Sequence, residues 1–143
     1  MATHEQLSQE PPLPGALTMG LLEQIFSKAC QAVHGAMDVP EISVEELKAL
    51  MDQKEDFLLI DVREKSEYEI CSIPGARLIP MMDIVDKVGD LDKEKAIAVH
   101  CHHGGRSAQV VQFLKKNGFS RVVNVAGGVE AWADKIDSSM KKY

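Results

Sequence analysis

The residue types that could do chemistry gather in one segment, residues 100–107, which reads HCHHGGRS. An apolar run leads into it and a helical pattern follows it, so Cys101 is expected between the end of a strand and the start of a helix. Ligands bind at the carboxyl ends of parallel strands in α/β sheets. Unpaired backbone N–H groups and the positive end of the helix dipole stabilise a thiolate there. Cys101 is therefore predicted to be a nucleophile at neutral pH.

The residues that follow Cys101 are suited to holding negative charge on its sulfur. Gly104 and Gly105 allow the loop to curl, so that successive backbone N–H groups point inward as an anion-binding nest. Arg106 adds fixed positive charge, and two histidines, which titrate near neutral pH, add positive potential at the mouth of the pocket. The predicted substrate-binding residues are His102, His103, Gly104, Gly105, Arg106 and Ser107.

The spacing within this loop indicates which anion it takes. Four residues separate Cys101 from Arg106, whereas phosphatases that work through cysteine have a loop one residue longer, wide enough for a tetrahedral phosphate. The tighter loop favours a single extra sulfur atom, held on Cys101 as a persulfide whose terminal charge faces the backbone donors. The predicted function is sulfur transfer through this persulfide. A cysteine-dependent phosphatase or arsenate reductase, and a non-catalytic sulfur-carrier or partner-binding module, are the alternatives.

The same segment raises the question of a metal site, because thiolate and imidazole groups are good zinc ligands. Consecutive residues such as Cys101, His102 and His103 rarely point at one ion, and no second cluster in the sequence supplies further ligands. No metal site is therefore predicted.

The elements that must position this segment lie beyond Pro40, where short apolar runs alternate with helical patterns. Such alternation is typical of a mostly parallel sheet covered by helices. Strands are expected at 57–60, 77–79, 96–100 and 121–125. Helices are expected after the capping box of Ser43 and Glu46, after Pro80, at 107–116 and around 129–136.

Residues 1–37 are expected to form a loose leader followed by an amphipathic helix, and residues 38–143 the main domain. Leu21, Ile25, Ala29 and Val33 recur at every fourth position and form one apolar stripe over 18–33. Packing of this stripe on its own chain is the expected outcome. Dimerisation and docking on a partner are the alternatives.

Length and composition bound the class of protein. A chain of 143 residues is about one domain, and its net charge of −6 disfavours nucleic-acid binding, which needs clustered Lys and Arg. The three cysteines form no C-x-x-C pair, which indicates a reduced, intracellular protein. The first basic residue is Lys28, so no signal peptide is expected, and no apolar run approaches the ~20 residues of a membrane span. The predicted location is the cytoplasm.

Five motifs stand in order along the chain: LLIDVRE at 58–64, EYE at 67–69, IPGA at 73–76, AVHCHHGGRS at 98–107 and NVAGGVEAW at 124–132. Together they resemble the single-domain rhodaneses, a family of sulfurtransferases. The resemblance spans nearly all of residues 40–136, and it departs at Ser72, where the family commonly has histidine.

The resemblance implies an α/β fold with a five-stranded parallel sheet and helices on both faces. It further implies a ping-pong reaction in which Cys101 takes a sulfane sulfur from thiosulfate or a persulfide and passes it to cyanide, a thiol or a protein acceptor. By the same similarity Arg106 orients and charges the loop, and Asp61 and Arg63 support the site. No metal or organic cofactor is implied.

Overall fold

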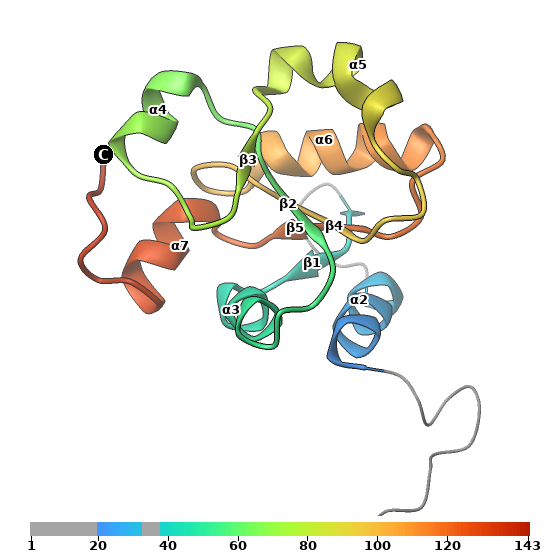
Figure 1. Cartoon of the computed structure of the whole chain (residues 1–143), viewed down its shortest axis with the longest axis horizontal. Coiled ribbons are helices and arrows are strands. Elements are labelled where there is room, and N and C mark those ends of the chain that lie inside the picture. The colour runs from blue at the N-terminus through green and yellow to red at the C-terminus, as the bar shows by residue number, and fades with distance from the viewer. Residues whose placement is uncertain (1–19, 33–37) are drawn as a thin grey trace, which may run out of the picture.

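Strands and helices alternate along the chain in the computed structural model, which describes residues 20–32 and 38–143 (Figure 1). The strands in these residues are β1 (Glu41–Ile42), β2 (Leu58–Asp61), β3 (Arg77–Leu78), β4 (Ile97–His100) and β5 (Val122–Val125). The α-helices are α2 (Leu21–Gln31), α3 (Val44–Asp52), α4 (Lys65–Ile70), α5 (Ile84–Lys87), α6 (Gly105–Lys116) and α7 (Gly128–Lys135). Two 3-10 helices, η3 (Met81–Asp83) and η4 (Val88–Asp90), flank α5.

The strands form one five-stranded sheet in the order β1-β5-β4-β2-β3, and every strand pair is parallel. Parallel neighbours need crossover connections, and helices provide most of them here. All carboxyl ends therefore meet at one edge of the sheet, where Cys101 follows the central strand β4. The predicted five-stranded parallel sheet is confirmed.

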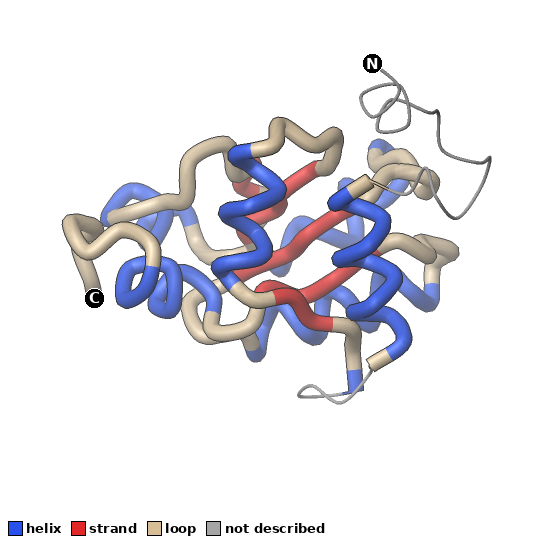
Figure 2. Tube along the Cα trace, turned by 90° about the horizontal axis from the view of Figure 1, so that it is seen from below, coloured by secondary structure: helices blue, strands red, loops and turns tan. Residues whose placement is uncertain are grey.

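Helices cover both faces of the sheet, as predicted (Figure 2). One buried cluster joins α2, α3 and α7 to one face, and a second joins α5 and α6 to the other. All four residues of β4, and all four of β5, are buried, which explains why these strands are almost wholly apolar in sequence. No helix within residues 20–32 and 38–143 is long and apolar enough to cross a bilayer.

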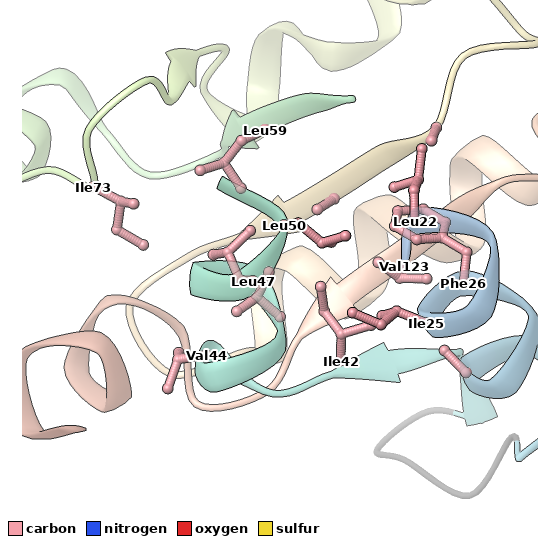
Figure 3. Packing of buried hydrophobic residues seen from close by; sticks show 14 of the residues in the cluster. Leu22, Ile25, Phe26, Ile42, Val44, Leu47, Leu50, Leu59, Ile73 and Val123 are labelled. Atoms are coloured by element: carbon pink, nitrogen blue, oxygen red, sulfur yellow. The ribbon is translucent and has the colours of Figure 1, made fainter. Parts of the chain in front are cut away.

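The amphipathic helix α2 packs on its own chain. Leu22, Ile25 and Phe26 are each at least 92% buried and belong to the same cluster as Ile42 and Val123 of the sheet (Figure 3). The predicted helix is thus confirmed over Leu21–Gln31. The leader and the outer turns of the predicted 18–33 span lie outside the described residues, and the domain boundary at residue 38 stays a prediction.

The predicted capping box opens α3 as expected. The backbone N–H of Glu46 donates to the Ser43 hydroxyl at 3.0 Å, and the Ser43 N–H donates to the Glu46 carboxylate at 2.9 Å. The short helix α4, by contrast, was not predicted. None of its residues is buried, so it has no apolar stripe that sequence periodicity could reveal.

Candidate active site around Cys101

Cys101 lies in the loop between β4 and α6, and hydrogen-bond donors surround its sulfur. The residue is 1% exposed. Its Sγ accepts hydrogen bonds from the backbone N–H groups of Gly104 at 3.1 Å and Ser107 at 3.4 Å, and the Ser107 hydroxyl lies 3.3 Å away. Gly104 precedes α6 with a φ of 117°, in the left-handed region that favours glycine. This loop can stabilise negative charge on the sulfur.

Asn124 on β5 fixes the loop from the neighbouring strand, and it was not among the predicted site residues. It is fully buried, and its Oδ1 lies 2.5 Å from the Ser107 hydroxyl. Its Nδ2 donates to the carbonyl of Gly104 at 3.2 Å and to a carboxylate oxygen of Glu41 at 3.0 Å. A hydroxyl has one proton, so Ser107 donates either to Asn124 or to Cys101 Sγ. The sequence signal that could have identified Asn124 is a polar residue within an otherwise apolar, buried strand.

The first turn of α7 is bonded to the backbone of the Cys101 loop. The N–H of Val129 donates to the Cys101 carbonyl at 2.9 Å, and the N–H of Glu130 donates to the His102 carbonyl at 3.1 Å. Gly128 has a φ of 58°, and a Cβ on it would lie 2.3 Å from the Cys101 carbonyl oxygen. Only glycine lets the helix approach the loop this closely.

Arg106 pairs with Glu67 of α4. Its two terminal nitrogens donate to the two carboxylate oxygens at 2.8 and 3.0 Å. These hydrogen bonds hold the pKa of Glu67 at about 2 and raise the pKa of Arg106 above its usual value. Glu67 offsets part of the fixed positive charge that Arg106 was expected to add to the loop, and the role of Arg106 in substrate binding stays a prediction.

Asp61 and Arg63 form a fully buried ion pair beside the site. The guanidinium donates to Asp61 at 2.6 and 2.9 Å and to the Cys71 carbonyl at 2.8 Å. Burial alone lowers the pKa of Arg63, but the hydrogen bonds to Asp61 and Tyr143 outweigh it and raise the pKa. His100 is also fully buried, 3.8 Å from Asp61, and burial lowers its pKa. These contacts support the loop that follows β2.

Tyr143 connects Arg63 to the Glu67 carboxylate that pairs with Arg106, and it was not predicted as a site residue. Its hydroxyl accepts a hydrogen bond from Arg63 and donates one to Glu67, both at 2.9 Å. Its ring stacks on His102 with centroids 4.1 Å apart. The carboxyl-terminal end of the chain accordingly lies beside α4 (Figure 1). A continuous polar network therefore runs from Arg63 through Tyr143 and Glu67 to Arg106.

His102 and His103 lie together at the start of α7 and face Glu130. The Nε2 atoms of the two histidines lie 3.4 and 3.1 Å from the same carboxylate oxygen. Burial, and next the neighbouring His103, lower the pKa of His102, so this side chain adds less positive potential than expected. The fold also brings the carboxylate of Glu130, a further type of metal ligand, to the two histidines, which sequence order alone did not indicate.

A parallel sheet covered by helices, with a buried cysteine in the loop after its central strand, defines a protein of the rhodanese type. A family model described as the rhodanese-like domain matches residues 43–135, and the chain belongs to this family.

Individual relatives are consistent with that assignment. YtwF of Bacillus subtilis, named as a proposed sulfurtransferase, is 43% identical over 96 residues, which cover 67% of this chain and 92% of YtwF. YrkF of the same organism, named as a proposed sulfur carrier, is 37% identical over 102 residues, covering 71% of this chain but 55% of YrkF. This chain thus spans about half the length of that carrier. A crystal structure of a rhodanese-like domain protein from Staphylococcus aureus superimposes with a TM-score of 0.62 at 38% identity, covering 67% of this chain and 93% of the other.

Proposed function

We propose that the protein is a sulfurtransferase that carries sulfur as a persulfide on Cys101. The observation that carries the proposal is the cradle around Cys101 Sγ, formed by the N–H groups of Gly104 and Ser107 at the start of α6. Relatives named as sulfurtransferases and sulfur carriers support it. The location proposed for this chemistry is the cytoplasm, since its reducing conditions keep a cysteine nucleophile in the thiol form.

The reaction with thiosulfate proceeds in two displacements. The Cys101 thiolate attacks the sulfane sulfur, the S–S bond of thiosulfate breaks, and sulfite leaves with the bonding electron pair. The product is a Cys101 persulfide. An acceptor thiolate or cyanide then attacks the outer sulfur, and the Cys101 thiolate leaves with the electron pair of the second S–S bond. Each step conserves electrons without an external oxidant or reductant.

The loop suits this cycle because its donors act on both charged states. Gly104 and Ser107 donate to the thiolate before transfer, and the same donors are available to the persulfide after it. The Ser107 hydroxyl can turn from Asn124 toward the sulfur when the sulfur is charged. Donors that are already in place need no reorganisation during the reaction, which is the usual origin of electrostatic catalysis.

Intact-mass spectrometry tests the proposal. Incubation with thiosulfate should add one sulfur, about 32 Da, to the chain through nucleophilic attack. The adduct should persist in Cys71→Ser and Cys30→Ser, which alter the other two free cysteines, and disappear in Cys101→Ser. An adduct that persists in Cys101→Ser, or none with thiosulfate and with persulfide donors, would overturn the assignment. Hydrolysis of p-nitrophenyl phosphate above the Cys101→Ser background would favour the phosphatase alternative.

A pure carrier role is the second candidate, supported by the relative named as a proposed sulfur carrier. Turnover kinetics separate the two. An enzyme releases many thiocyanate molecules per chain when thiosulfate and cyanide are in excess. A carrier loaded by a partner passes on one sulfur per loading event and shows no sustained turnover with these small molecules alone.

A further inference from the structure

Two histidines and a carboxylate converge at the mouth of the Cys101 loop, outside the sulfur cradle. His102 and His103 come from the loop, and Glu130 comes from the first turn of α7. One ligand atom from each lies within 4.8 Å of the other two. The imidazole rings stack with centroids 4.0 Å apart, and both Nε2 atoms face the same oxygen of Glu130. No bond in the proposed sulfur transfer forms or breaks at any of these ligand atoms.

We propose that His102, His103 and Glu130 form a binding site for a divalent transition-metal ion of the zinc class. Imidazole nitrogen and carboxylate oxygen are ligands that zinc takes together, whereas calcium and magnesium prefer oxygen alone. Three protein ligands leave one of four tetrahedral positions for water or an external ligand.

The observed spacings fit a tetrahedral ion. Metal-ligand bonds of about 2.0–2.1 Å place neighbouring ligand atoms about 3.3 Å apart at the tetrahedral angle. The Nε2 atoms of His102 and His103 lie 3.4 and 3.1 Å from Glu130 Oε1. Two of the three edges of the ligand triangle thus already have the required length. The third edge is within 4.8 Å, and the two stacked rings must change their relative orientation for both nitrogens to bind one ion.

The backbone places these ligands before any ion binds. The Glu130 N–H donates to the His102 carbonyl at 3.1 Å, which fixes the two ligand-bearing segments relative to each other. The ring of His102 is held between His103 and Tyr143, with which it stacks. His103 is the most exposed ligand, at 65%, and gives an ion a path from solvent.

The site is separate from the nucleophile. Cys101 Sγ faces Gly104 and Ser107, and the residue is 1% exposed. Two of the ligands, His102 and Glu130, instead border a small hollow that Cys71 and Tyr143 also line. The three ligands do not include Cys101, so the proposal does not depend on the sulfurtransferase assignment.

Titration of the full chain with zinc sulfate by calorimetry, and with Co²⁺ by visible absorption, tests the site. We expect one ion per chain and the absorption bands of tetrahedral Co²⁺. Glu130→Gln keeps both histidines and should weaken binding at least about tenfold. Asp134→Asn makes the same charge change on the same helix, outside the cluster, and should bind as wild type does. Removal of His4 and His34, which are distant from the loop in sequence, should leave the affinity unchanged.

Three results would overturn the proposal. Equal affinities in wild type and Glu130→Gln would show that the carboxylate is only a hydrogen-bond acceptor for the histidines. Full affinity in His103→Asn would do the same for that histidine. A near-ultraviolet charge-transfer band with Co²⁺ that is lost in Cys101→Ser would assign binding to the thiolate. Thermal unfolding of each variant without metal checks that it is folded.

Discussion

Replacing Gly128 with alanine tests how closely α7 and the Cys101 loop are joined. Gly128 has a φ of 58°, and a Cβ there would lie 2.3 Å from the carbonyl oxygen of Cys101 and 2.6 Å from that of His102. Real Cβ atoms essentially never come this close to backbone oxygens, so α7 must move away from the loop. Gly75 is the matched control, because it has a φ of 83° and a Cβ added to it would meet nothing within 4 Å.

The expected cost has three parts. The left-handed conformation costs alanine about 1–2 kcal/mol at either glycine. At Gly128 the forced displacement adds about 1–3 kcal/mol, as overpacking does in a core. Loss of the hydrogen bond between Val129 N–H and the Cys101 carbonyl adds about 1 kcal/mol. Gly128→Ala should therefore be roughly 2–4 kcal/mol less stable than Gly75→Ala, a large share of the 5–15 kcal/mol typical of a whole domain.

Urea denaturation followed by circular dichroism measures both free energies of unfolding. We expect the two variants to differ by the stated amount. Gly128→Ala should also lose sulfur-transfer activity, because its clash displaces the backbone of Cys101. Equal stabilities for Gly128→Ala and Gly75→Ala would refute the expected clash, since the close approach would then carry no energy.

Three other substitutions probe the contacts around the loop. Glu67→Gln should cost about 1–2 kcal/mol at pH 7, because Arg106 is about one-third exposed and solvent screens the pair. The pKa of Glu67 is lowered from 4.5 to about 2, so this stability is present above pH 4.5 and lost as pH falls through about 2. The unfolding free energies of wild type and variant should therefore converge near pH 2. A difference between them that stays constant with pH would contradict the pairing. Asn124→Leu removes the hydrogen bonds that Asn124 makes with the Ser107 hydroxyl and the Gly104 carbonyl, and it should lower the unfolding free energy by about 1–3 kcal/mol. A fall in kcat should accompany the loss, and an unchanged turnover would disprove the role of Asn124. Tyr143→Phe removes a hydroxyl that donates to Glu67 and should cost about 1 kcal/mol in thermal unfolding, whereas an unchanged Tm would show that the hydroxyl stabilises nothing.

The sequence predicted what depends on local patterns. The apolar runs and the capping box of Ser43 and Glu46 located β2, β4, β5 and α3, and the run from Cys101 to Ser107 placed the sulfur at the start of a helix. The sequence was sufficient for these elements because each pattern spans only a few neighbouring residues.

The contacts that the sequence did not predict join distant residues. Arg106 and Glu67 are 39 positions apart, and His103 and Glu130 are 27 apart. Only the crossover topology brings α4 and α7 to the carboxyl end of β4, so no spacing could reveal these partners. Tyr143 is 76 positions from Glu67 and reaches the site because the chain returns past α7 to α4.

The depth of Cys101 bears on how long a carried sulfur would survive. A residue that is 1% exposed keeps its Sγ out of contact with bulk water, with Gly104 and Ser107 packed against it. Under the proposed reaction, peroxides and bulky disulfides would reach the inner sulfur of a persulfide slowly. The outer sulfur would then pass mainly to slender acceptors that can enter the loop. The burial of Cys101 would therefore set the lifetime of the persulfide, in addition to the rate of its transfer.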